Sequence, residues 1–307
     1  MPITTRRPSA SVVNDRGREQ QDTQQLCSGE ARDDEVAEHF NLVQNVIVNR
    51  LDDKTLLSQC SYLSSFQEAS AWITANAADF VIRGAGLEVY RSTDEQPGYY
   101  GFPELAGLEA YLHSGSNIKN IIGRDQQLAR ELISECVKGI IQAEFFLYEE
   151  RGYPTQQDYF DHWCAINDKT CYTFSHQDEV EGDWSQHATG VKRKCNLFNR
   201  SHVLNFEKGD NGGIVSGTFI DTYHEINILL RLDERNVVLD ARAAHVRIPD
   251  KVCVSGAAGL PKLVGHSLAE MKKKEIIYLV GHRDGCIHLS ELVYDACRLI
   301  RAAGANG

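Results

Sequence analysis

The feature that most constrains the fold is a change of pattern after about residue 195. From there, alternating apolar and polar segments follow one another across short turns rich in Gly, Asp and Asn, at 202–206, 213–220, 225–232 and 237–248. Such segments predict consecutive antiparallel strands. Three helical stretches follow, at roughly 251–264, 268–281 and 287–303. Strands followed by helices predict an α+β domain with the helices on one face of an antiparallel sheet.

The preceding region predicts a mainly helical N-terminal half. Val43, Ile47 and Leu51 recur at a helical spacing, and a longer apolar row runs over 125–153. A strand-like segment over 81–102 lies between them. We detect no internal repeat. The predicted organisation is a disordered polar arm, a mainly helical domain and an α+β domain, over 1–34, 35–190 and 191–307 respectively.

Composition narrows the classes of partner. The 307 residues carry a formal net charge of −11. The sequence has no basic stripe of the kind that binds nucleic acid. No apolar run approaches the roughly 20 residues that cross a bilayer, and no secretory leader is recognisable. We therefore expect a cytoplasmic protein without membrane contact. The nine cysteines then predict reduced thiols, some of them bound to metal.

The last third of the chain resembles a bacterial family described only as domain-of-unknown-function family 2889. The resemblance lies within Gly217–Arg301 and carries no activity with it. Three stretches support it: Asp221-Thr222-Tyr223-His224-Glu225, Ile248-Pro249-Asp250-Lys251-Val252-Cys253 and Gly285-Cys286-Ile287-His288-Leu289.

A more distant resemblance is to the NifU/IscU-like iron–sulfur scaffold proteins. Glu225–Arg242 resembles their second and third strands. Cys253 and Cys286 fall at their middle and final cysteines, and His224 falls at their ligand aspartate. Thr222 replaces their first cysteine. The resemblance implies a NifU/IscU-like fold for the C-terminal domain and a metal or iron–sulfur site short of one thiolate.

The residues themselves favour a metal site at these positions. Cys253 and Cys286 stand at predicted helix starts, where the helix N-terminus favours a thiolate. Alternation along 218–232 turns His224 toward the helices. His224, Cys253 and Cys286, with His288 as a fourth ligand or as an acid/base, predict a zinc or iron site with an open position. Taken singly, each cysteine is better explained as a core residue.

Two carboxylates complete the candidate site. Glu291 lies one turn beyond His288 and is a candidate for orienting its imidazole. Glu144 lies on the apolar row of the long predicted helix, either as a buried acid with a raised pKa or at the helix edge. His288 and Glu144 are the candidate catalytic residues. The aromatic stretch over 155–190 is either a pocket wall for a planar substrate or a packed connector.

Two main hypotheses follow. The first is a zinc- or iron-dependent enzyme that acts on a small organic substrate, aromatic ones included, by hydrolysis or lyase-type cleavage. The second is a non-enzymatic iron–sulfur or sulfur-handling protein, and a zinc-stabilised binding module is a third. Thr222 separates the first two, because a cluster scaffold needs a thiolate there. The substrate, the metal and assembly into a homo-oligomer stay open.

Overall fold

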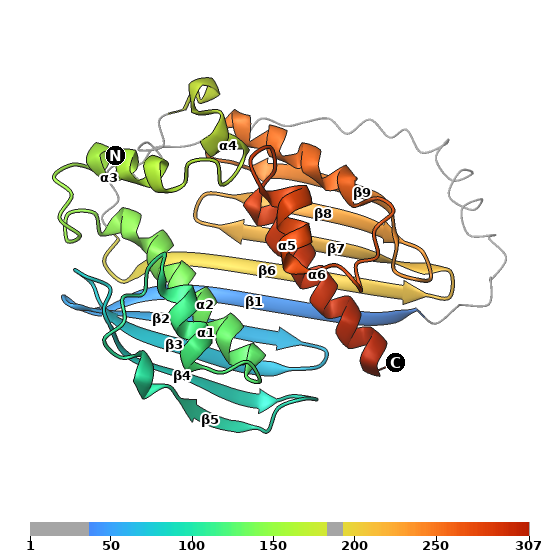
Figure 1. Ribbon diagram of the computed structural model, residues 1–307, viewed down its shortest axis with the longest axis horizontal. Coiled ribbons are helices and arrows are strands. Elements are labelled where there is room, and N and C mark those ends of the chain that lie inside the picture. The colour runs from blue at the N-terminus through green and yellow to red at the C-terminus, as the bar shows by residue number, and fades with distance from the viewer. Residues whose placement is uncertain (1–36, 183–192, 307) are drawn as a thin grey trace, which may run out of the picture. The chain divides into compact units, whose positions relative to one another are not determined.

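One antiparallel sheet of nine strands is the scaffold of the chain (Figure 1). The computed structural model describes residues 37–182 and 193–306. The strand order across the sheet is β5-β4-β3-β2-β1-β6-β7-β8-β9. The strands are β1 (Glu38–Asp52), β2 (Thr55–Ser64), β3 (Glu68–Asn76), β4 (Ile82–Arg91), β5 (Gly98–Gly101), β6 (Asn196–Gly209), β7 (Gly212–Asp221), β8 (Glu225–Leu232) and β9 (Val238–Arg247).

Two long helices, α2 (Gln127–Ala143) and α6 (Ile287–Asn306), lie across one face of the sheet (Figure 1). Helix α2 packs on β1, β2, β3 and β6, and α6 packs on β6, β7, β8 and β1. A Cβ atom on Gly139 would lie 2.7 Å from Val46 Cγ1, so the close approach of α2 to β1 requires glycine there. No helix in the described ranges is long and apolar enough to cross a membrane.

The remaining helical segments are shorter than α2 and α6. The three helical stretches expected after the strands differ in character: 251–264 is a 3-10 helix, 268–281 is helical only from Lys273, and 287–303 lies within α6. The full set of shorter helical segments is η1 (Pro103–Leu105), α1 (Ser114–Ile121), η2 (Glu144–Phe146), α3 (Gln156–Ile166), α4 (Tyr172–Ser175), η3 (Gln177–Glu179), η5 (Lys251–Leu263), α5 (Lys273–Ile276) and η6 (Ile277–Gly281).

The prediction of a mainly helical N-terminal half is wrong, because that half contributes β1–β5 to the sheet. The spacing of Val43, Ile47 and Leu51 fits one face of a strand as well as one face of a helix. That face points away from the helices: Ile47 and Leu51 are 39% and 56% exposed, whereas the alternate residue Val46 is buried. The predicted arm over 1–34 lies outside the described residues.

The C-terminal strands β6–β9 form where they were expected, but they do not form a separate NifU/IscU-like sheet. Strand β6 pairs with β1 along most of its length, with Val43 opposite Val203. The segments expected to be two domains therefore contribute strands to one sheet, and the described residues from 37 onward form one compact unit.

Apart from the edge strand β5, the sheet consists of two matching halves, a repeat that the sequence pattern did not reveal. β1–β4 and β6–β9 are both four-stranded meanders, and each is followed by helical segments and then by a long helix. Gly107 and Gly265 have φ values of 89° and 88°. Their N–H groups donate to the carbonyls of Ile82 and Val238 respectively, both at 2.9 Å. The two connections are thus built in the same way.

Candidate metal and substrate site

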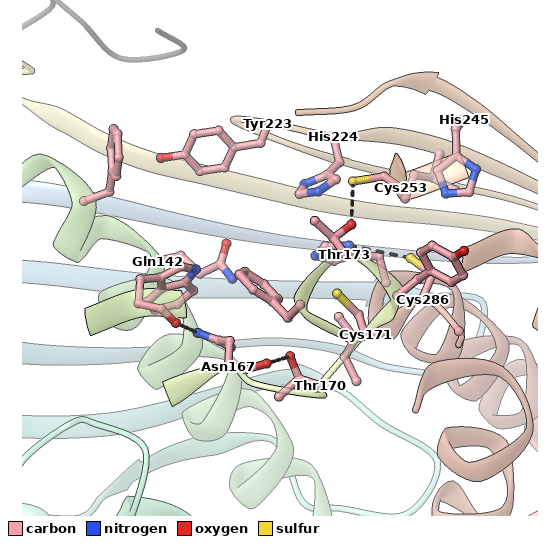
Figure 2. A pocket seen from close by; sticks show the side chains of 18 of the residues that line it. Gln142, Asn167, Thr170, Cys171, Thr173, Tyr223, His224, His245, Cys253 and Cys286 are labelled. Carbon is pink, nitrogen blue, oxygen red and sulfur yellow. Dashed lines mark hydrogen bonds between the residues drawn. The ribbon is translucent and has the colours of Figure 1, made fainter. Parts of the chain in front are cut away.

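A cavity of about 120 Å³ lies at the junction of α2, the α3–α4 segment and the start of α6 (Figure 2). Aromatic side chains line it together with a group of histidines and cysteines. The histidines and cysteines are His224, His245, His288, Cys171, Cys253 and Cys286. Four of the six site residues expected from the sequence therefore line one cavity: His224, Cys253, Cys286 and His288.

His224 stands between Asp221 and His288. Its Nδ1 lies 3.1 Å from Asp221 Oδ1, and its ring centroid lies 4.2 Å from that of His288. One carboxylate oxygen and one nitrogen from each ring lie within 4.8 Å of one another. Within the described residues, this is the one group of three His, Cys, Asp or Glu side chains whose ligand atoms lie this close together.

The turn between β7 and β8 positions this group. The Asp221 carboxylate accepts hydrogen bonds from the backbone N–H groups of Tyr223 and His224, at 2.7 and 2.6 Å. An Asp side chain that bonds the backbone in this way closes a local turn. Arg247, at the end of β9, donates to the carbonyls of Asp221 and Thr222 at 2.6 and 2.7 Å. The turn is therefore held from both sides.

The burial of Asp221 and His224 corrects the expected alternation. Residues 218–232 do not form one strand, because β7 ends at Asp221 and β8 begins at Glu225. Along β7 the side chains under the helices include Phe219, whereas Ile220 is 38% exposed. The alternation of buried and exposed side chains shifts at the turn, so that Asp221 and His224 are both buried. His224 is buried, as the expected inward orientation requires, and Asp221 is buried beside it.

The carboxylate of Asp221 is charged at neutral pH. Its burial would raise its pKa, but the adjacent His224, a hydrogen bond from that ring and nearby His288 hold the pKa well below its usual range. A histidine that donates its Nδ1–H to a carboxylate leaves Nε2 unprotonated and able to bind a metal ion. This arrangement is common at metal sites.

The cysteines lie close to this group, and burial raises the pKa of their thiols. Cys286 Sγ lies 3.9 Å from His288 Nδ1, and Cys253 Sγ lies 3.1 Å from Thr173 Oγ1 (Figure 2). Burial raises the pKa of Cys286 to about 12 and raises that of Cys253 above its usual value, which outweighs the helix N-termini. Burial likewise lowers the pKa of His288 well below its usual range. Without a cation, the thiolate–imidazolium pair of a cysteine nucleophile does not form.

The two carboxylates expected at the site lie elsewhere. Glu144 is fully buried, and it accepts hydrogen bonds from Tyr111 and from Arg151, both at 2.7 Å. It does not line the cavity. Glu291 is on α6 beyond His288, but its carboxylate pairs with Lys138 at 2.8 Å and with Arg200. Both acids thus have ion-pair partners of their own.

The first half of the chain contains a matching turn without the site. Ser64 ends β2, and its hydroxyl accepts from the N–H groups of Phe66 and Gln67 at 3.2 and 3.0 Å. Arg91 on β4 donates to the carbonyls of Ser64 and Ser65 at 2.8 and 3.0 Å. Ser64 and Gln67 thus match Asp221 and His224. Leu128, the second residue of α2, matches His288, the second residue of α6.

Sequence reasoning missed Asp221 and His245. The signal for Asp221 was present, since an Asp two and three residues before free N–H groups is typical of a tight turn. His245 lies on β9, and no local pattern separates it from a surface strand residue. It lines the cavity because a bulge in the β8–β9 pairing places it opposite Ile226.

Comparison with known proteins gives one match. No curated protein and no solved structure matches the chain. The comparisons give no support to the NifU/IscU-like resemblance. The residues that match a family include Asp221, His224 and His288 as well as both cysteines expected at the metal site. Residues 208–300 match the family described as "Protein of unknown function (DUF2889)", which confirms that resemblance for this part of the chain.

Proposed function

We propose that the protein is a metal-dependent enzyme that acts on a small organic molecule by hydrolytic or lyase-type chemistry. The observation that carries this proposal is the convergence of Asp221, His224 and His288, within 4.8 Å, beside a cavity of substrate size. Convergent polar groups at a largely apolar cavity are typical of a binding or active site.

The donor set suits a divalent transition metal. One carboxylate and two imidazoles are the ligands on which Zn²⁺ and Fe²⁺ are commonly held with open positions. Cys253 and Cys286 line the same cavity and remain candidates for completing the ligand set. A divalent cation would supply Lewis-acid chemistry there, by polarising a carbonyl or by lowering the pKa of a bound water.

The first half of the chain supports a functional role for these residues. Ser64, Gln67 and Leu128 occupy the matching positions, so the fold builds the same turn and the same helix start without a carboxylate or an imidazole. The second half therefore carries donor atoms that its own architecture does not require.

Metal analysis tests the proposal. Protein purified without oxygen and without chelators should carry about one zinc or iron per chain, without labile sulfide. The double variant Asp221→Ser/His224→Gln, which copies the first-half turn, should lose this metal. The matched control Ser64→Ala/Gln67→Ala should keep it. In calorimetric titrations with Zn²⁺ and with Fe²⁺ after chelator treatment, the unmodified chain and the control should bind the metal. The variant Asp221→Ser/His224→Gln should not bind it.

The alternatives give different results. Equal metal binding by the unmodified chain and by Asp221→Ser/His224→Gln would overturn the site. Iron with matching labile sulfide would favour the non-enzymatic iron–sulfur hypothesis. Cys253→Ser and Cys286→Ser decide whether thiols belong to the ligand set, with Cys60→Ser as the control, because Cys60 is buried under α2 away from the cavity.

A further inference from the structure

The face of the sheet that α2 and α6 do not cover is the open face (Figure 1). Its side chains alternate along each strand with the buried ones that pack under the helices. Across the six neighbouring strands β3-β2-β1-β6-β7-β8, the pairing places them side by side in rows. The side chains of the middle rows form the central patch, and each is exposed or half-buried. The central patch consists of Ser70, Trp72 and Thr74 on β3, Leu57, Gln59, Ser61 and Leu63 on β2, Val43, Asn45, Ile47 and Asn49 on β1, Asn199, Ser201, Val203 and Asn205 on β6, Ser216, Thr218 and Ile220 on β7, and Asn227 and Leu229 on β8.

The central patch carries no full charge. None of its side chains is Asp, Glu, Lys or Arg, although these residues make up 24% of the chain. Charged side chains begin at its border, with Glu68, Glu88, Glu207, Glu225 and Arg242. An ordinary solvent-facing surface has about 25–35% charged residues. An uncharged centre inside a charged rim is instead typical of protein–protein interfaces.

Trp72 lies flat on the sheet. A Cβ atom on Gly86 would lie 2.9 Å from its Nε1, and one on Gly84 would lie 3.4 Å from its Cη2. The indole therefore extends across β4 over these two glycines and does not project from the open face. Sheets that pack face to face are about 10 Å apart, so a low surface of this kind lets a second sheet approach.

Apolar side chains are distributed among the amides and hydroxyls of the central patch. Leu63, Leu229 and Ile47 are 50%, 47% and 39% exposed. Val43 pairs with Leu63 on one side and with Val203 on the other, so one row is apolar over three strands. Packing against a partner would remove this apolar surface from water, which is the dominant favourable contribution to most protein association.

The central patch has the area that a stable dimer needs. Strands about 4.8 Å apart, each with about four outward residues at a rise of about 3.3 Å per residue, give six strands a footprint of about 700 Å². Interfaces of standard size bury about 800 Å² and roughly 20–30 residues on each partner. The patch alone therefore supplies most of such an interface, and its charged border supplies the rest.

We infer that the protein forms a symmetric dimer in which the central patches of two copies pack face to face. A two-fold interface must be complementary to itself. The patch meets this condition, because its amide and hydroxyl side chains both donate and accept hydrogen bonds. The net charge of −11 lies outside the patch, so two copies that meet there bring none of this charge into contact. Helices α2 and α6 lie on the outer sides of the dimer, and the inference does not rest on the proposed function.

Sedimentation velocity on the full chain tests the inference. The unmodified chain should sediment as a dimer at micromolar concentration. Asn45 lies at the centre of the patch, between Ser61 and Ser201, and the axis of a two-fold interface passes through its centre. Asn45→Glu therefore brings two carboxylates close together, and the dissociation constant should rise at least about tenfold. Asn117→Glu, at an exposed position of α1, is the matched control and should leave the dissociation constant unchanged.

A charge exchange separates loss of the contact from loss of the fold. Asn45→Lys should weaken the dimer as Asn45→Glu does. An equal mixture of the two variants should dimerise again, because opposite charges then meet across the interface. Mixing cannot restore a dimer whose chains are unfolded, and circular dichroism checks the fold of each variant.

Three results would overturn the inference: an unmodified chain that is monomeric at micromolar concentration, an unchanged dissociation constant in Asn45→Glu, or two folded variants whose mixture stays monomeric. The first would leave the open face to residues 1–36 or to a different protein. The second would place the contact between copies on another surface. None of these results depends on metal binding, so they leave the proposed function to its own test.

Discussion

Ser64 and Asp221 occupy the same position in two matching turns, and each accepts the backbone N–H groups two and three residues further on. A hydroxyl is therefore enough to close this turn. The carboxylate at Asp221 and the imidazole at His224 are additions that only the second turn carries. The molecule thus contains an internal comparison that separates what its fold needs from what its candidate site needs.

We expect Asp221→Ser/His224→Gln to remain folded. The serine hydroxyl can accept the same N–H groups, so the free energy of unfolding should fall by no more than about 2 kcal/mol. Asp221→Leu, which accepts nothing, leaves these buried N–H groups unpaired and should cost about 2–4 kcal/mol. Urea denaturation measures both. If both variants lost the same free energy of unfolding, the turn itself would require the carboxylate, and Asp221 would not be an addition for a site.

Arg247 and Arg91 give a second matched pair. Each donates to two successive carbonyls of its turn at 2.6–3.0 Å, and Arg247 also donates to the carbonyl of His224 at 3.1 Å. Arg247→Gln and Arg91→Gln should each cost about 1–3 kcal/mol of unfolding free energy, through the lost charge-assisted hydrogen bonds. Because only Arg247 holds the turn of Asp221 and His224, only Arg247→Gln should weaken binding of Zn²⁺. A similar loss of metal affinity in Arg91→Gln would show a general effect of stability.

Glu144 is expected to act in stability and not in catalysis. Its fully buried carboxylate is the partner of Arg151, whose guanidinium also lies 4.1 Å above the ring of Phe80. Glu144→Gln should cost about 3 kcal/mol, because it leaves a largely buried cation without its counter-ion. Glu109→Gln is the control: Glu109 is exposed and lies 3.5 Å from the same arginine. Full stability with lost activity in Glu144→Gln would restore the catalytic interpretation.

The sequence predicted the C-terminal strands and both long helices, but most of the N-terminal strands were wrongly predicted as helices. A spacing of four residues is shared by one helix face and one strand face, so Val43, Ile47 and Leu51 could not decide between them. Their burial decides: these residues lie on the open face of the sheet, and the core of β1 is made by the intervening residues. Pairing with β6, remote in sequence, fixes β1 as a strand.

The internal repeat was missed because it survives in a few residues only. Pro103, Leu105 and Gly107 match Pro261, Leu263 and Gly265, while the residues between them differ. On the helices, Glu131-Leu132-Ile133-Ser134-Glu135-Cys136-Val137-Lys138 matches Glu291-Leu292-Val293-Tyr294-Asp295-Ala296-Cys297-Arg298. What the two halves share is a pattern of turns, bulges and ion pairs, which becomes clear only with the hydrogen bonds in view.

The candidate site was predicted in part, because helix starts are visible in a sequence and convergence is not. Cys253 stands at a helix start, as expected, three residues after the N-cap Asp250, and Cys286 directly precedes α6. The sign of their pKa shifts could not be foreseen, since it depends on burial by the α3–α4 segment. Thr173 at 3.1 Å from Cys253 shows how closely that segment packs.

The matching helices also share a layer of ion pairs. Lys138 on α2 contacts Glu135 and Glu291, and Arg298 on α6 contacts Asp295 and Glu131. Each cation therefore joins its own helix to the other helix. Burial would raise the carboxylate pKa values in this layer, but Arg200 and Lys138 hold the pKa of Glu291 well below its usual range. A hydrogen bond from His202 lowers the pKa of Asp295.

These lowered pKa values predict a loss of stability in acid. The carboxylates hold their protons less tightly in the folded chain than in the unfolded chain, whose pKa values are about 4. Their contribution is therefore complete above about pH 5 and declines as the pH falls toward the folded-state values. Urea denaturation between pH 7 and pH 3 should show this decline, and Glu291→Gln should make it shallower while costing stability at pH 7. Glu207→Gln, on the exposed side of β6, should leave the slope unchanged. A slope that is the same for Glu291→Gln and the unmodified chain would exclude this layer as the source of the acid sensitivity.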